Sequence, residues 1–275
     1  MTGVEAIAGA FAGALTDGRR AALMPYMMGC FPDQATSAEI GLAYAQAGAD
    51  LIELGVPFSD PLADGPVIHA AGTAALSAGA NLHRVLDVCS AVAAQVPVVV
   101  MCYTNVILAR GLRRFADALV AAGASGVIVP DMPLEEAPEV RAACDERGLA
   151  LVPLVAPTTP EQRLAQIGAQ ARGFLYTVSV TGTTGERSRV DGIAGVIARA
   201  AAHTSVPVAI GFGIGTPAQA ADAADAGADG VIVGTRLVRA AGEAARPAES
   251  VRELVREFAV ALRSDPSDPS RAHTG

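Results

Sequence analysis

The chain has 275 residues and a formal net charge of −8 at pH 7; 51% of its residues are hydrophobic and 17% are charged. These proportions predict a folded protein with a sizeable core, exclude global disorder, and argue against a nucleic-acid-binding surface. No apolar run reaches the roughly 18–20 residues of a membrane span, and the N-terminus lacks the pattern of a secretion signal. The four cysteines are widely spaced, which is typical of reduced thiols in a cytoplasmic protein, and the histidines do not predict a zinc site.

Short apolar runs without alternation predict strands that are buried on both faces, as in parallel sheets. In chain order, the expected strands are Leu23–Met28, the end of AGADLIELG (47–55), Val96–Tyr103, the end of AGASGVIVP (122–130), Leu149–Val155, Phe174–Val178, Val206–Ile210 and the end of AGADGVIVG (226–234). The expected helices between them are Ser37–Ala47, Asn81–Ala94, Gly111–Ala122, Glu135–Arg147, Pro160–Ala169, Gly192–His203 and Pro217–Ala226. In the three similar AG-rich segments a glycine is placed to end a helix, and Thr216-Pro217 is placed to begin one.

Eight strands alternating with helices over about 250 residues predict the α/β class and a single (β/α)8 TIM barrel. Extra short helices are expected at the N-terminus and after the eighth strand, and a doubly wound open sheet is the alternative. No Pro- or Ser-rich linker divides the chain, so we expect one barrel domain over residues 1–263. The polar, turn-rich residues 264–275 predict a disordered tail.

In such a barrel, function belongs to the loops at the carboxyl ends of the strands. Glycines gather there: TGTTGE (181–186) after the sixth strand, GFGIGT (211–216) after the seventh and GTR (234–236) after the eighth. Glycine lets backbone N–H groups approach an anion closely, and a helix start adds its positive end. The glycines therefore predict a phosphate site. The simpler interpretation is that they only allow the chain to turn tightly at the strand ends.

Two carboxylates lie in the stretch ELGVPFSDPLADGP (53–66). Glu53 closes the second expected strand, and Asp64 follows in a loop long enough to fold back over the same barrel mouth. Carboxylates in different environments can divide the acid and base roles of one reaction. The structural alternatives are an ion pair with an arginine for Glu53 and a plain Asp-Gly turn for Asp64.

The other candidates at the barrel mouth are apolar or aromatic residues at strand ends: Tyr26, Met101, Tyr103, Tyr176 and Phe212. Together with a phosphate site and two carboxylates, they suggest a phosphorylated substrate with an aromatic head. All 20 basic residues are arginine, and the missing lysine excludes a Schiff-base aldolase. Of the mechanisms considered, acid–base catalysis by carboxylates is the one that these residues leave.

The sequence LIELGVPFSDPLADGP resembles, almost residue for residue, a signature of tryptophan synthase alpha chains. The resemblance continues through VMCYTN (100–105), VPDMP (129–133), YTVSVTGTTGER (176–187), AIGFGIGTPAQ (209–219) and GADGVIVGT (227–235). It covers roughly residues 5 to 260 and implies a (β/α)8 barrel that cleaves indole-3-glycerol phosphate to indole and glyceraldehyde 3-phosphate. MMGCFP (27–32) departs from the commoner pattern, which often has an acid near that turn.

The resemblance also implies roles for individual residues. Glu53 would be the proton donor and acceptor, Asp64 would hold the indole N–H, and Tyr176 would orient Glu53. The phosphate would lie on backbone or hydroxyl groups of Gly185, Gly213, Gly234 and Thr235. The indole ring would lie between Tyr103 and Phe212, with Tyr26 and Met101 also in contact with the substrate.

The resemblance implies a partner as well. The chain would carry no cofactor and would pass indole to a beta chain that carries pyridoxal phosphate, in an α2β2 heterotetramer. The partner surface is expected around Pro57–Pro61 and the loop after the sixth strand. Two alternatives remain open at this point: a free-standing indole-3-glycerol-phosphate lyase, and a non-catalytic barrel that binds a phosphorylated ligand and regulates a partner.

Overall fold

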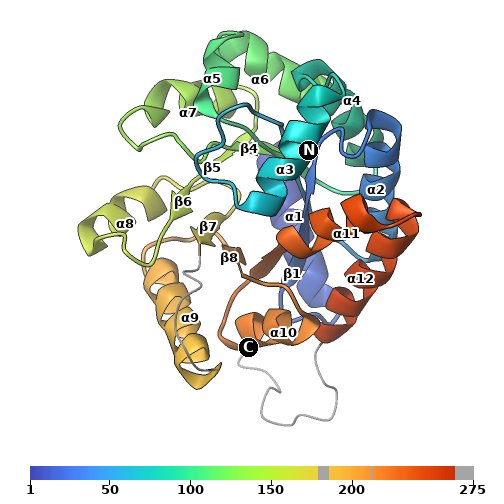
Figure 1. The fold of residues 1–275 in the computed structure, drawn as a ribbon. Helices are drawn as coiled ribbons and strands as arrows, with labels where there is room; N and C mark the ends of the chain where they lie inside the picture. Colours follow the sequence, from blue (N-terminus) through green and yellow to red (C-terminus); the bar gives the residue numbers. More distant parts are fainter. Residues whose placement is uncertain (179–185, 212, 264–275) are drawn as a thin grey trace.

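Residues 1–178, 186–211 and 213–263 are described by the computed structural model, which shows parallel strands surrounded by helices (Figure 1). The strands are β1 (Ala22–Met28), β2 (Ile52–Gly55), β3 (Val98–Met101), β4 (Gly126–Ile128), β5 (Ala150–Val152), β6 (Leu154–Val155), β7 (Leu175–Val178), β8 (Val208–Gly211) and β9 (Gly230–Val233). They pair in the order β5-β4-β3-β2-β1-β9-β8-β7-β6, and every pair is parallel.

The nine strands form a (β/α)8 barrel because β5 and β6 are the two halves of one expected strand, Leu149–Val155, divided at Pro153. Proline has no N–H to give to a sheet ladder. Its carbonyl still accepts the backbone N–H of Tyr176 at 3.0 Å. The first half therefore pairs with β4 and the second half with β7, and the two ends of the strand order meet at Pro153.

Helices surround the strands: α1 (Gly3–Thr16), α2 (Gln34–Ala47), α3 (Pro66–Ser77), α4 (Leu82–Ala93), α5 (Thr104–Leu108), α6 (Leu112–Ala121), α7 (Ala137–Asp145), α8 (Glu161–Gly168), α9 (Glu186–Ala201), α10 (Pro217–Asp225), α11 (Thr235–Glu243) and α12 (Pro247–Ala261). The expected extra helices are α1 at the N-terminus and α11 and α12 after the last strand. The helices α3 and α5 were not expected from the sequence. No helix in the described ranges is long and apolar enough to cross a membrane.

Local signals explain several helix ends. The glycines of the three AG-rich segments, Gly48, Gly123 and Gly227, follow α2, α6 and α10 with φ of 106°, 76° and 97°, a conformation that glycine adopts without a steric penalty. Thr216 begins α10 as expected. Its side chain accepts the backbone N–H of Gln219, and the Gln219 side chain accepts the N–H of Thr216 in return, which is a capping box.

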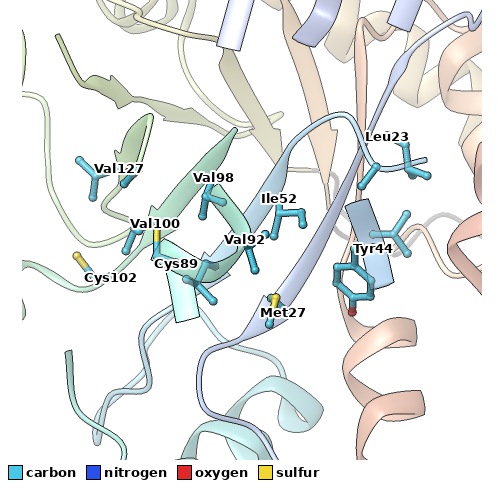
Figure 2. Close-up of a cluster of buried hydrophobic side chains, with 14 of the residues drawn as sticks. Leu23, Met27, Tyr44, Ile52, Cys89, Val92, Val98, Val100, Cys102 and Val127 are labelled. Carbon is cyan, nitrogen blue, oxygen red and sulfur yellow. The ribbon is translucent and has the colours of Figure 1, made fainter. Parts of the chain in front are cut away.

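Alternate residues of each strand face two different cores. Leu23, Ile52, Val98 and Val100 pack between the barrel and the outer helices, together with Tyr44 of α2 (Figure 2). The intervening residues face the barrel interior, which is filled by Ala22, Met24, Val99, Ile128, Val152, Phe174, Ala209 and Ile232, with Ile7 and Phe11 of α1 packed against them. Because Ile52 and Leu54 both belong to the outer core, the side chain of Glu53 between them faces the interior.

Candidate active site

A cavity of about 640 Å³ opens at the carboxyl ends of the strands. It is lined by Tyr26, Glu53, Ala63, Asp64, Gly65, Ile68, Met101, Tyr176, Gly213, Ile214, Gly215, Thr216, Gln219, Ile232, Gly234, Thr235, Arg236 and Arg239. The structure thus brings together Tyr26, Glu53, Asp64, Met101, Tyr176, Gly213, Gly234 and Thr235 from the expected site. Two other expected members, Gly185 and Phe212, lie outside the described residues.

Glu53 is a buried carboxyl group without a partner. It lies on β2 in register with Tyr26 of β1 and Val99 of β3, and it is 1% exposed. Neither of its carboxyl oxygens has a hydrogen-bond partner in the described chain, so the expected alternative of an ion pair with an arginine is not what the structure shows. Burial, and secondarily the charge of Asp64, raises the pKa of Glu53 to about 8. The group is therefore protonated at neutral pH and can act as an acid.

Two tyrosines, Tyr26 of β1 and Tyr176 of β7, line the same cavity. Tyr26 and Tyr176 are both buried, and each lies against a glycine on the neighbouring strand. A Cβ on Gly55 would stand 2.1 Å from Tyr26 Oη, and a Cβ on Gly211 would stand 2.3 Å from Tyr176 Oη. Burial raises the pKa of both phenols, and the charge of Glu53 contributes to each, so both hydroxyls keep their protons. These strand-end glycines make room for the rings.

Asp64 is held by a side chain from the next strand-end loop. Tyr103 donates a hydrogen bond to Asp64 Oδ1 at 3.1 Å and accepts one from the backbone N–H of Ala63 at 3.0 Å. The Tyr103 ring is stacked on Phe58, with 5.1 Å between the centroids. Burial raises the pKa of Asp64, whereas the Tyr103 hydrogen bond and the charge of His69 oppose that rise. Asp64 is thus more than a turn residue.

Tyr103 itself is 4% exposed and is not among the residues that line the cavity. Its expected contact with an aromatic ring stays a prediction. What the structure adds is its position behind Asp64, where it fixes the carboxylate that faces the cavity.

The start of α11, which lines the cavity, is suited to an anion. Gln219 Oε1 accepts the N–H groups of Gly215 and Thr216 at 2.8 and 3.2 Å, so those two donors are already used. By contrast, α11 begins at Thr235 without a side-chain cap. The first N–H groups of a helix have no partner within the helix, and its dipole favours negative charge there. A phosphate could bind at this helix start, beside Gly234 and Gly213.

The sequence analysis did not select several lining residues, chiefly Arg236 and Arg239. Arg236 was visible as the last residue of the GTR segment, and Arg239 lies three residues further on, the spacing of one helix face. Within the described ranges, no group of three or more His, Cys, Asp and Glu side chains could hold a metal ion.

The fold and the cavity together define a class of protein. The carboxyl ends of a parallel (β/α)8 barrel carry a protonated buried carboxyl group, a second carboxylate and an uncapped helix start. This arrangement is that of a barrel enzyme equipped for acid–base chemistry on an anionic substrate. Comparison with known proteins narrows this class. The family model described as tryptophan synthase alpha chain matches residues 12–264.

Individual relatives agree with that match. The tryptophan synthase alpha chain of Synechococcus elongatus is 46% identical over 266 residues, which cover 96% of this chain and 99% of that protein. The one from Prochlorococcus marinus is 48% identical over 229 residues, 82% of this chain and 83% of that protein. A solved structure of tryptophan synthase from M. tuberculosis superposes with a TM-score of 0.86 at 36% identity and covers 94% of this chain and 98% of its own. This chain belongs to the tryptophan synthase alpha chain family.

Proposed function

We propose that this chain cleaves indole-3-glycerol phosphate to indole and glyceraldehyde 3-phosphate, as the alpha subunit of a tryptophan synthase. Membership of the family supports the activity. The observation that carries the assignment to particular residues is the placement of Glu53, buried and without a partner, in one cavity with Asp64 and the uncapped start of α11. Burial of a carboxyl group without a partner is costly, and a catalytic role accounts for it.

The proposed reaction begins with proton transfer from the Glu53 carboxyl group to C3 of the indole ring. The ring becomes an indolenine with a positive charge at its nitrogen, and the Asp64 carboxylate accepts a hydrogen bond from that N–H and stabilises the charge. Glu53, now a carboxylate, takes the proton of the C3′ hydroxyl. The C3–C3′ bond breaks, its electron pair returns to the ring, and indole and glyceraldehyde 3-phosphate leave with Glu53 protonated again.

The environments of the two acids fit this division of roles. Glu53 must be neutral at the start, and its pKa is raised to about 8. Asp64 must be a carboxylate; burial raises its pKa, and the hydrogen bond from Tyr103 acts against that rise by favouring the charged form. Tyr176 is proposed to orient Glu53, supported by its place in the same cavity and by the influence of the Glu53 charge on its pKa.

The substrate is proposed to lie along the cavity with its phosphate at Gly213, Gly234 and Thr235 and its indole ring near Tyr26 and Met101. The residues Gly185, Phe212 and Tyr103 remain proposed contacts on the strength of the family resemblance. The reaction as proposed uses no cofactor in this chain.

The partner is proposed to be a tryptophan synthase beta chain with pyridoxal phosphate, in an α2β2 assembly, and the location is proposed to be the cytoplasm, since the family is one of cytosolic biosynthetic enzymes. Gel filtration of a mixture with the beta chain from the same source tests the assembly. Co-elution and a rise in the rate of indole release are expected. An isolated chain that is fast without the partner and does not co-elute would indicate a free-standing lyase.

Replacement of the acid tests the assigned chemistry. Glu53→Gln keeps the shape of the side chain but removes its proton transfer, so indole release should fall at least about 10²-fold. Glu257→Gln on the exposed side of α12 is the matched control and should retain full activity. Turnover by Glu53→Gln within a few-fold of the unmodified chain would overturn the role of Glu53.

A further inference from the structure

Two arginines near the start of α11 have no part in the chemistry described above. Arg236 and Arg239 lie in the first turns of α11, three residues apart, so their side chains leave the same face of that helix. Both line the cavity that contains Glu53, and both are exposed to solvent. Within residues 1–178, 186–211 and 213–263, neither guanidinium group makes an ion pair or a hydrogen bond.

Other exposed arginines, such as Arg110 and Arg256, also have no ion-pair partner in the described part of the chain, so it is the position of the pair on α11 in the cavity wall that distinguishes it. Arg19 is paired with Asp50, Arg147 with Asp117 and Arg163 with Glu135. The chain as a whole is acidic, with a net charge of −8. Two cations without an ion-pair partner among the described residues therefore line the same cavity as the two carboxyl groups of Glu53 and Asp64.

We propose that Arg236 and Arg239 bind the substrate's phosphate through their side chains and determine the preference for a phosphorylated over an unphosphorylated indole glycerol. This inference rests on the proposed function. The N–H groups at the start of α11 would hold one side of the phosphate, and the two guanidinium groups would bind the oxygens that remain. The planar fork of arginine matches two phosphate oxygens at once.

A second observation places a ligand in this cavity independently of the helix start. Glu53 is 1% exposed, its carboxyl oxygens have no partner in the described chain, and it faces the same space. The cavity thus combines a buried acid suited to a reacting group with a helix start and two arginines suited to an anion. A substrate that carries both a reacting carbon and a phosphate would engage both sets of groups.

The arginines should act on binding and not on chemistry. The phosphate keeps its bonds and its charge during the cleavage, so contacts to it are equally strong in the ground state and in the transition state. Such uniform contacts lower KM and leave kcat unchanged. Because both side chains are exposed, salt should weaken their contribution.

The test measures indole release by the full chain assembled with its beta chain, on indole-3-glycerol phosphate and on unphosphorylated indole glycerol. Arg236→Ala and Arg239→Ala should each raise KM for the phosphorylated substrate about tenfold, with kcat within about twofold. Lysine at either position keeps the positive charge but not the planar fork of arginine. The KM of each lysine variant should therefore lie between those of the unmodified chain and the alanine variant. KM for the unphosphorylated substrate should stay unchanged. Arg256→Ala on α12, an exposed arginine outside the cavity, is the matched control.

Binding of inorganic phosphate, measured by calorimetry on the same variants, separates this proposal from the proposed function. Dissociation constants that rise in the same order as KM support the arginine pair. If KM and phosphate binding stay within about twofold while Glu53→Gln abolishes turnover, the arginine proposal is wrong and the function stands. If the unmodified chain releases no indole, the function fails and phosphate binding alone decides the arginine proposal. Equal melting temperatures across the variants exclude misfolding as the cause of a loss.

Discussion

The hydroxyl of Tyr176 lies against the α-carbon of Gly211, on the next strand of the barrel. A Cβ at position 211 would stand 2.3 Å from Tyr176 Oη and 2.8 Å from Cε1, distances that no side chain tolerates without movement. Tyr176 Cα is in register with Ala209, two residues before Gly211, so the ring leans along its neighbour toward the cavity. The glycine at the end of β8 therefore makes room for a ring that lines the cavity, although it contributes no side chain itself.

Gly211→Ala should displace Tyr176 and, through it, Glu53. We expect a loss of about 1–3 kcal/mol in the free energy of unfolding and a marked fall in the rate of indole release. In a Tyr176→Ala background the same substitution should cost little stability, because the opposing ring is gone. Chemical denaturation of the four chains of this double-mutant cycle gives the coupling free energy between positions 176 and 211.

Gly13→Ala on α1 is the control, because a Cβ there meets nothing within 4 Å. It should be neutral or stabilise the chain by up to about 1 kcal/mol through helix propensity. If Gly211→Ala costs the same stability with and without the Tyr176 ring, the close approach does not matter for stability.

Tyr103 should act through Asp64. Tyr103→Phe keeps the ring stacked on Phe58 but removes the hydroxyl that donates to Asp64 and accepts from Ala63. We expect a stability loss of about 1 kcal/mol, the usual net value of a hydrogen bond, and a lower kcat because Asp64 is no longer fixed. Tyr44→Phe is a comparison, since the Tyr44 hydroxyl lies 3.5 Å from the carbonyl of Tyr26, at the outer limit of a hydrogen bond, and should cost less.

Burial of Glu53 should make stability depend on pH. Its pKa rises from an ordinary 4.5 in the unfolded chain to about 8 in the folded chain, so between these values the folded chain binds more protons. The contribution of Glu53 is therefore fully present below about pH 4.5 and is lost as the pH rises through about 8. Glu53→Gln cannot lose a proton, so it should be more stable than the unmodified chain by roughly 1–3 kcal/mol above pH 8 and similar near pH 5.

Urea denaturation of both chains across this range checks the prediction. Titration of other groups, such as the half-buried Asp50, cancels in the difference between the two chains. Glu39→Gln on the exposed face of α2 is the control variant for the loss of one glutamate. If the free energies of unfolding of the unmodified chain and Glu53→Gln differ by the same amount at every pH, the pKa of Glu53 is not raised by folding.

The sequence predicted the barrel well because its strands are apolar throughout and its helix ends carry local signals. The glycines of the AG-rich segments and Thr216 ended or began helices as expected, and Glu53 lies on the expected second strand, whereas its orientation toward the interior is given by the structure. The division at Pro153 and the helix α3 were missed. Pro66 follows Asp64 and Gly65, and such a run indicates a turn as readily as the first turn of a helix.

The candidate site could be predicted only where a residue type or a family motif carried the signal. The pairing of Tyr103 with Asp64 joins positions 39 residues apart and depends on the path of the loop after β2, which no local pattern specifies. Arg239 looks in sequence like any exposed helical arginine. Only the packing of α11 beside β1 gives it a position in the cavity wall.

The pH dependence of kcat/KM should report the two acids separately. Glu53 must be protonated to supply its proton, so kcat/KM should fall above pH about 8, the value to which burial raises its pKa. Asp64 must be ionised, so a second fall is expected on the acid side, at the pKa that burial raises and Tyr103 lowers. Tyr103→Phe removes the opposing hydrogen bond and should therefore move the acid limb to higher pH while the alkaline limb stays in place. A shift of the alkaline limb alone would mean that Tyr103 acts on Glu53 and that the two roles are assigned the wrong way round.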